Sequence, residues 1–347
     1  MRSPLTAAAA APRRIGPFCV LPIGLGCMNL SHAYGTPPSP EQGEALLRAA
    51  LDAGVTLFDS AALYGFGANE TLLGRVLKGE RGRIVLCSKG GLAGEPVGPG
   101  GALQRVIDGR PETLSRHCED SLRRLQTDHI DLYYLHRWDK RVPIEESVGA
   151  LSRLLEQGKL RAIGLSEVSA ATLRRAHAVH PISAVQSEYS LTTRQVEIAL
   201  LDACQALGAT FVAFSPLARA FLADALPDVG ALPSKDIRRG MPRFAPEHHA
   251  ANLRLLPGYR ALADEAGCTP AQLALAWLLH RAPHIVAIPG TTRVEHLHEN
   301  LGAAHVRLTP DLAARLDALI NTRSVSGPRY SVATQTEIDT EEFAAPS

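Results

Sequence analysis

The sequence predicts an α/β protein whose main domain is a single (β/α)8 TIM barrel. From residue 20 onward, short apolar runs alternate with amphipathic segments, which is the pattern of repeated strand–helix units around a parallel sheet. Several runs, such as Ile130–Leu135 and Phe211–Phe214, are almost continuously apolar, as strands are when helices cover them. Eight such runs are present, and no shift in composition marks a second domain.

The eight runs define the expected strands, each followed by a helix. The strands are expected at 21–26, 55–60, 84–89, 130–136, 162–166, 184–189, 210–215 and 284–289. Two helix starts are clearly marked, because the first amide groups of a helix need acceptors that a capping side chain supplies. Ser39 and Thr269 are each followed by proline and, three residues later, by glutamine, which predicts a capping box at each.

Two segments interrupt the strand–helix rhythm, at 90–109 after the third strand and at 218–246 after the seventh. Long loops in a compact domain commonly act as lids or binding loops, and both would lie on the catalytic face of a barrel. The chain is expected to divide into a disordered leader (1–12), the barrel domain (13–325) and a C-terminal tail (326–347).

Composition excludes several classes of partner. The 36 lysines and arginines are balanced by 35 aspartates and glutamates, so nucleic acid is not an expected partner. No stretch approaches the roughly 20 apolar residues of a membrane span, and none is expected. The six cysteines form no CxxC pair and have no zinc-ligand spacing, so we expect no metal site and reduced thiols in a cytoplasmic protein.

Four polar residues stand where chemistry is placed in a barrel. Asp59, Lys89 and His136 lie at the ends of the second, third and fourth strands, and Tyr64 follows Asp59 by five residues. A buried lysine and aspartate cost several kcal/mol unless they are paired. A lysine near a tyrosine favours the phenolate, so we expect Lys89 to lower the pKa of Tyr64 from about 10. A purely structural Asp59–Lys89 pair is the alternative at this point.

With these four residues in place, the chain resembles the aldo-keto reductase superfamily. The resemblance extends through Gly24–Met28, the loop motif Gly67–Glu70, Ile288–Thr291 and the closing Glu299-Asn300. Gly24–Met28 together with Gly164–Glu167 is similar to the microbial and plant branch that includes pyridoxal reductases and broad-range aldehyde reductases.

The resemblance implies NADPH-dependent reduction of aldehydes or ketones to alcohols. Tyr64 would be the general acid, tuned by Lys89 and Asp59, and His136 would orient and polarise the substrate carbonyl. NADPH is the implied cofactor, and a small carbonyl compound is the implied partner.

The resemblance also implies a cofactor site. Ser166 and Gln186 would hold the carboxamide, while Phe214 would stack on the nicotinamide where the family usually has tyrosine. Glu167 stands where much of the superfamily has asparagine. The implied cofactor-binding residues are Gly26, Cys27, Met28, Ser166, Gln186, Phe214, Ser215, Pro216, Leu217, Arg219, Gly290, Thr291, Thr292, Arg293, Glu299 and Asn300.

The phosphate groups have their own implied contacts. Ser215–Leu217 and Arg219 would lie against the pyrophosphate, and 290–293, before a helix start, would take the adenosine 2′-phosphate. Many relatives have a lysine and a later arginine here, whereas this chain has Gly290 and His296, which leaves Arg293 as the fixed positive charge. NADPH is expected, with NADH as a weaker alternative. A solvated arginine at a helix start is the alternative interpretation of Arg293.

Substrate choice is expected to depend on the two long loops and on the tail near Arg329. Met28, Trp138 and Phe221 are expected to line a substrate pocket that suits aromatic aldehydes; dicarbonyls such as methylglyoxal, pyridoxal and quinones are also candidates. Two other functions stay open: a regulatory or redox-sensing NADP(H)-binding module like the potassium-channel β subunits, and a Schiff-base aldolase using Lys89. The sequence indicates no oligomeric state.

Overall fold

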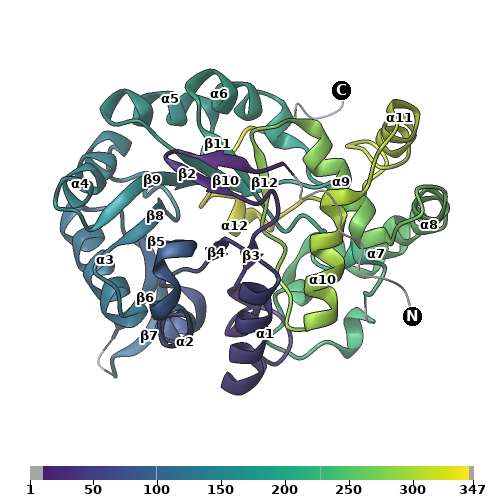
Figure 1. The fold of residues 1–347 in the computed structure, drawn as a ribbon. Coiled ribbons are helices and arrows are strands. Elements are labelled where there is room, and N and C mark those ends of the chain that lie inside the picture. Colours follow the sequence, from purple (N-terminus) through teal and green to yellow (C-terminus); the bar gives the residue numbers. More distant parts are fainter. Residues whose placement is uncertain (1–10, 99, 227, 344–347) are drawn as a thin grey trace.

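The computed structural model describes residues 11–98, 100–226 and 228–343. Its centre is a sheet of eight parallel strands that curls into a barrel with helices outside it (Figure 1). The strands are β3 (Leu25–Gly26), β4 (Leu57–Asp59), β5 (Val85–Gly90), β8 (Ile130–Leu135), β9 (Leu160–Ser166), β10 (Ala184–Glu188), β11 (Thr210–Phe214) and β12 (Ile285–Ala287). They neighbour one another in chain order, and bridges from Ile23 to Ala287 and from Gly26 to Gly290 close the ring. The predicted (β/α)8 barrel is confirmed, and each of the eight predicted strands overlaps an observed one.

A helix follows each strand along the chain, as a strand–helix repeat requires. These helices are α1 (Pro40–Asp52), α2 (Ala68–Leu77), α3 (Pro111–Leu125), α4 (Ile144–Glu156), α5 (Ala170–Val179), α6 (Leu200–Leu207), α9 (Pro270–Arg281) and α10 (Val294–Gly302). Further helices are α7 (Pro246–Leu253), α8 (Leu256–Glu265), α11 (Pro310–Leu319) and α12 (Val332–Gln335). Both expected capping boxes form, at Ser39 with Gln42 and at Thr269 with Gln272. None of the helices described here is both long and apolar enough to span a bilayer.

The interior of the barrel is closed at one end by a hairpin that the sequence analysis did not predict. Strands β1 (Arg13–Ile15) and β2 (Phe18–Val20) pair antiparallel. Ile15 and Val20 are buried and pack against inward-facing strand residues such as Leu132 and Val212. Strands of three residues are too short to show a periodic pattern, which is why they escaped detection. The predicted leader lies mostly outside the described residues.

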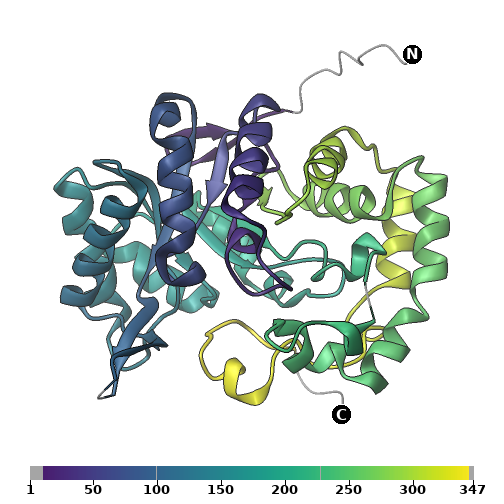
Figure 2. The ribbon, with the colours of Figure 1, turned by 90° about the horizontal axis from the view of Figure 1, so that it is seen from below.

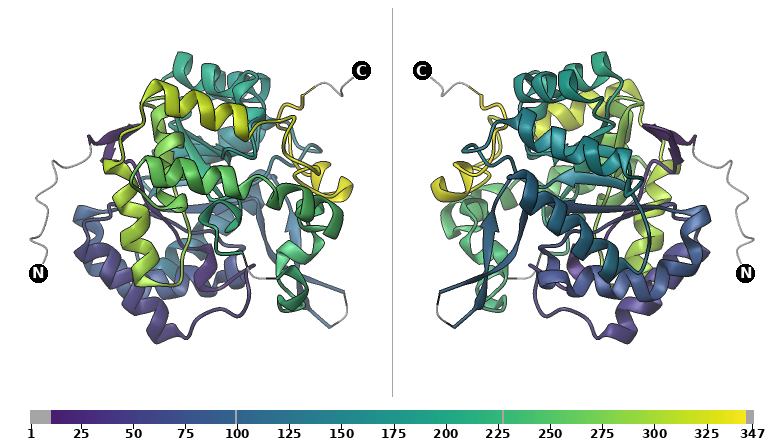
Figure 3. Two further views of the ribbon diagram at one scale, coloured as in Figure 1. Left: turned by 90° about the vertical axis from the view of Figure 1, so that its right-hand side faces the viewer. Right: turned by 90° about the vertical axis from the view of Figure 1, so that its left-hand side faces the viewer.

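The opposite end of the barrel carries the long insertions. Where the segment 90–109 was expected to form a loop, β6 (Leu92–Val97) and β7 (Ala102–Ile107) form an antiparallel hairpin. The segment 218–246 consists of short 3-10 turns joined by irregular backbone. Figures 2 and 3 show that this hairpin, the segment after β11 and the C-terminal residues around α12 lie on the side away from the β1–β2 hairpin. These three segments therefore lie at the carboxyl ends of the barrel strands.

Candidate active site

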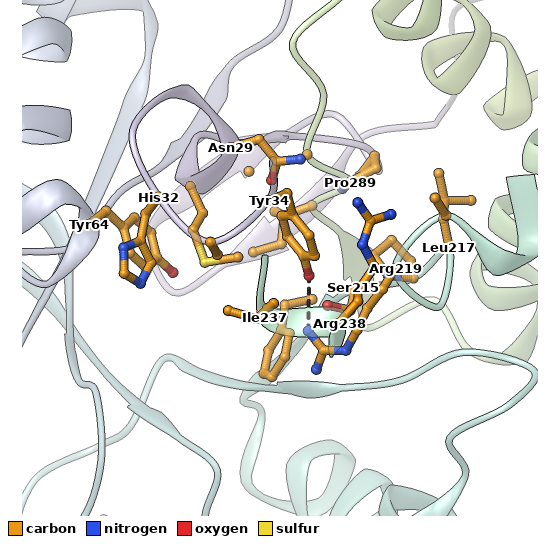
Figure 4. A pocket seen from close by; sticks show the side chains of 18 of the residues that line it. Asn29, His32, Tyr34, Tyr64, Ser215, Leu217, Arg219, Ile237, Arg238 and Pro289 are labelled. Atoms are coloured by element: carbon orange, nitrogen blue, oxygen red, sulfur yellow. Dashed lines mark hydrogen bonds between the residues drawn. The ribbon is translucent and has the colours of Figure 1, made fainter. Parts of the chain in front are cut away.

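A cavity of about 780 Å³ opens at the carboxyl ends of the barrel strands (Figure 4). Most of the residues that the sequence analysis singled out contribute to its wall. They are Gly26, Met28, Asp59, Tyr64, His136, Ser166, Gln186, Phe214, Ser215, Pro216, Leu217, Arg219, Gly290, Thr291, Thr292, Glu299 and Asn300. The volume falls in the range typical of sites that enclose a small molecule or cofactor.

Lys89 lies behind this wall and connects two of the residues in it. Its ammonium group donates to the Asp59 carboxylate, to the Ser60 carbonyl oxygen at 2.7 Å and to the Tyr64 hydroxyl at 3.2 Å. All three protons of the ammonium therefore have acceptors, as a buried charge requires. Lys89 and Asp59 are buried, at 1% and 3% exposed.

The charge state of Lys89 follows from these partners. Burial alone would lower the pKa of the amine, but the Asp59 carboxylate and the Tyr64 hydroxyl outweigh burial and raise the pKa above its ordinary value. Lys89 is therefore a permanent ammonium at neutral pH.

The expected direction of the Tyr64 pKa shift is wrong. Burial raises the pKa of the phenol, and although Lys89 acts to lower it, burial is the larger effect and the pKa ends above its ordinary value. The phenol thus keeps its proton at neutral pH, which is the form that a proton donor needs. Lys89 favours the phenolate that remains once the proton has left.

His136 stands edge-on to Tyr64, with ring centroids 5.9 Å apart and an interplanar angle of 85°. Burial, and then the positive charges of Lys89 and Arg137, hold the pKa of His136 well below its ordinary value. The imidazole is therefore neutral at physiological pH and can donate a hydrogen bond from one ring nitrogen.

The depressed pKa of His136 makes stability pH-dependent. Below its ordinary pKa of about 6.5, the unfolded chain takes up a proton that the folded imidazole does not, so this residue makes folding less favourable as the pH falls. We expect the difference in urea midpoint between pH 7.5 and pH 5.5 to be smaller in a His136→Gln variant than in the wild type. An unchanged difference would show that His136 does not contribute to the pH dependence.

Gln186 and Ser166 are two further polar residues on the cavity wall, and they come from the neighbouring strands β10 and β9. Gln186, on β10, donates from Nε2 to the free carboxylate oxygen of Asp59 at 2.8 Å. Ser166 ends β9, and the Arg137 guanidinium donates to its hydroxyl at 3.4 Å. Ser166 and Gln186 are buried polar groups that line the same cavity as Phe214. This combination of an aromatic face and amide-binding groups fits a nicotinamide.

Glu167 adopts a left-handed backbone conformation, with φ of 58°, and is buried. Among the described residues that line the cavity, Glu167 is absent. Its carboxylate accepts from the Arg329 guanidinium at 2.7 Å, from the Ser187 hydroxyl at 3.0 Å and from the Glu188 amide at 3.2 Å. Glu167 therefore connects the end of β9 to the C-terminal tail, a role that its place in the sequence did not indicate.

Two residues expected in the cofactor site do not reach the cavity. Cys27 is fully buried in the core between sheet and helices, where its thiol points to the Leu25 carbonyl oxygen at 3.6 Å. Arg293 is 64% exposed and lies 3.5 Å from Glu295. The neighbouring Gly290, Thr291, Thr292 and His296 do line the cavity.

Two of the three expected substrate-pocket residues are also elsewhere. Trp138 donates from its indole nitrogen to the Val142 carbonyl oxygen at 2.8 Å and packs under Arg175. Phe221, in the segment after β11, is buried and packs in the hydrophobic core. Met28 does line the cavity. Of the three residues on which the expected preference for aromatic aldehydes rests, Met28 is therefore the one found on the cavity wall.

Several cavity residues were not anticipated: Asn29, His32, Tyr34, Arg105, Arg137 and Arg238. Arg137 directly follows His136, so its position at a strand end was a usable signal. Tyr34 shows what sequence could not indicate, because its hydroxyl accepts from Arg219, 185 residues away, at 2.9 Å (Figure 4). The Arg238 guanidinium lies over the Tyr34 ring, 5.4 Å from its centroid.

Comparison with known proteins gives a family for this arrangement. The model of the Aldo/keto reductase family matches residues 22–321. A glycerol dehydrogenase from Gluconobacter oxydans is 27% identical, with a TM-score of 0.83 over 92% of this chain and 98% of that one. An aldo/keto reductase from Klebsiella pneumoniae, solved with NADP and acetate, is 30% identical, with a TM-score of 0.69 over 92% and 99%.

A structure of an aldo-keto reductase from Klebsiella pneumoniae in complex with NADPH is 31% identical, with a TM-score of 0.67 over 94% of this chain and 100% of that one. These bacterial neighbours fit the expected microbial branch. The family model extends from before the first barrel strand to beyond the last, so it includes every strand that carries a residue of the cavity wall. The chain belongs to the aldo/keto reductase family.

Proposed function

We propose that this protein reduces aldehydes or ketones to alcohols with NADPH, and that Tyr64 donates the proton. The observation that carries the proposal is the position of the Tyr64 hydroxyl, which lies on the cavity wall and 3.2 Å from the Lys89 ammonium. A phenol that is protonated at neutral pH, with a neighbouring cation that stabilises the phenolate formed after proton transfer, is suited to general acid catalysis. The two relatives solved with NADP and NADPH support the choice of cofactor.

The chain's own groups divide the work. When bound, the reduced nicotinamide supplies the hydride that the carbonyl carbon accepts. The Tyr64 hydroxyl donates its proton to the carbonyl oxygen, and the neutral His136 donates a hydrogen bond to the same oxygen, which orients and polarises it. The Lys89 ammonium stabilises the phenolate that forms, while Asp59 and Gln186 keep the lysine side chain in place.

The wall residues that the family resemblance implied for the cofactor keep that assignment in this proposal. Ser166 and Gln186 would hold the carboxamide, Phe214 would stack on the nicotinamide ring, and Ser215, Leu217 and Arg219 would meet the pyrophosphate. The stretch Gly290–Thr292, with Glu299 and Asn300, would hold the adenosine end. The rest of the assigned wall consists of Gly26, Met28 and Pro216.

The exposed position of Arg293 limits what it contributes to the NADPH preference. Because a solvent-exposed charge pair contributes about 0–1 kcal/mol, we expect Arg293→Ala to weaken NADPH binding by no more than about fivefold and to leave NADH binding unchanged. Isothermal titration of both nucleotides measures this. A loss of more than about a hundredfold for NADPH alone would show that Arg293 turns inward onto the 2′-phosphate.

The Schiff-base aldolase alternative is disfavoured by the geometry. An aldolase lysine must be a free amine when it attacks a carbonyl, yet Lys89 is held as an ammonium by Asp59, Ser60 and Tyr64. A regulatory NADP(H)-binding module would use the same cavity, so the two functions differ only in turnover. Aldehyde-dependent oxidation of NADPH by the purified protein supports the reductase, whereas NADPH binding without turnover would favour the regulatory module.

A further inference from the structure

A buried arginine in the C-terminal tail reaches the ends of two barrel strands. Arg329 is 6% exposed. Its Nη2 donates to Glu167, directly after β9, at 2.7 Å, and its Nε donates to Glu188, the last residue of β10, at 2.9 Å. Two carboxylates on adjacent strands are thus joined by one guanidinium, a geometry for which its planar fork is suited.

The same cluster extends into the cavity wall through Arg219. Arg219 Nη2 donates to the Glu188 oxygen that Arg329 also uses, at 2.7 Å, while its Nη1 donates to the Tyr34 hydroxyl. Arg219 faces the cavity, whereas Arg329 lies behind it. One carboxylate oxygen therefore fixes the position of an arginine assigned to the pyrophosphate.

Arg329 also supports the aromatic part of the wall. Its guanidinium carbon lies 5.7 Å from the centroid of the Phe214 ring and 4.4 Å from that of Tyr330, distances at which a cation is attracted to an aromatic face. Phe214 and Tyr330 both line the cavity. Arg329 therefore contacts the residue assigned to nicotinamide stacking without touching the cavity.

We propose that Arg329 is a positioning residue for the cofactor, fixing Phe214, Arg219 and the turn at Ser166–Glu167 in the arrangement that binds NADPH. The inference rests on the proposed function, since it concerns the cofactor assigned there. Besides Arg329 and Arg219, the positive charges of Arg243 and Arg137 act on Glu188 and Glu167, respectively. Without Arg329, the buried Glu167 carboxylate would lose its guanidinium partner, while Glu188 would still accept from Arg219.

The tail has other attachments, so a variant of Arg329 tests this residue and not the whole tail. The Asp339 carboxylate accepts from the Ser169 hydroxyl at 3.0 Å, and the Asp339 amide donates to the Glu167 carbonyl oxygen at 3.0 Å. Elsewhere in the tail, the exposed Glu342 carboxylate accepts from the Gln335 side chain. Glu342→Gln is therefore a matched control, because it removes a tail carboxylate outside the buried cluster and away from the cavity wall.

The test is isothermal titration of NADPH into the wild type and into Arg329→Met, Arg329→Lys and Glu342→Gln, with the melting temperature of each. We expect the dissociation constant to rise about tenfold or more in Arg329→Met, since breaking a buried charge pair by removing one partner has large effects. The dissociation constant of Arg329→Lys is expected to lie between those of the wild type and Arg329→Met, because an ammonium keeps the charge but cannot replace the planar guanidinium that joins two carboxylates. Glu342→Gln is expected to match the wild type.

A second carboxylate variant separates positioning from folding. If the uncompensated charge causes the loss, Glu167→Gln combined with Arg329→Met should bind NADPH more tightly than Arg329→Met alone. Unchanged affinity in both Arg329 variants, with or without a lower melting temperature, would overturn the inference and leave the proposed function intact. A wild-type protein that binds no NADPH would contradict the proposed function, and the inference with it.

Discussion

Replacing Tyr64 by phenylalanine is expected to reduce aldehyde turnover about 10²–10⁴-fold, because the variant loses a positioned general acid. The ring itself should stay in place, since it stacks on His32 with centroids 6.1 Å apart and meets His136 edge-on. The dissociation constant of NADPH should therefore change by no more than about twofold. Steady-state oxidation of NADPH with 4-nitrobenzaldehyde, combined with isothermal titration, measures both quantities.

Tyr34→Phe provides a matched control for the Tyr64 variant. The Tyr34 hydroxyl also faces the cavity, but it contacts Arg219 and not Lys89. Its removal should affect NADPH affinity more than the turnover at saturating NADPH. If Tyr64→Phe kept turnover within tenfold of the wild type, the proton would have to come from another donor.

Replacing Lys89 by methionine is expected to remove turnover and to destabilise the fold. The substitution leaves the Asp59 carboxylate buried with Gln186 as its remaining partner, and breaking a buried pair in this way costs about 3–5 kcal/mol. It also removes the cation that stabilises the Tyr64 phenolate. Urea unfolding reports the first effect, and single-turnover oxidation of NADPH reports the second.

A double variant separates these two effects of Lys89. Asp59→Asn combined with Lys89→Met removes the unpaired charge, so much of the lost stability should return. Turnover should stay low, because the phenolate still lacks its cation. Recovery of turnover in the double variant would show that Lys89 acts only as a structural partner of Asp59.

The sequence predicted the barrel because the barrel depends on local patterns. An apolar run bounded by turns identifies a buried strand, and a polar residue at its end, such as Asp59, marks the end of the barrel at which the cavity lies. The catalytic roles of Asp59, Tyr64, Lys89 and His136 stay a prediction. The hairpin that closes the barrel has strands of three residues, too short for such a pattern. Arg329 meets Glu167 across 162 residues, a contact that no local pattern indicates.

The errors at individual residues have a common cause. Whether Cys27 or Phe221 faces the cavity depends on the path of the backbone around it, which the residue type does not determine. The predicted direction of the Tyr64 pKa shift was wrong for a related reason. The charge of Lys89 could be anticipated from the sequence, but the extent of burial, which decides the net direction, comes only from the packed structure.

The most direct test follows the hydrogen that the reaction transfers. The protein is incubated with 4-nitrobenzaldehyde and with NADPH carrying deuterium at both C4 positions, and the products are analysed by mass spectrometry. We expect 4-nitrobenzyl alcohol with one deuterium on the carbinol carbon, formed in equal amount to the NADPH consumed. Absence of the alcohol while NADPH binds, or alcohol without deuterium on that carbon, would contradict the account.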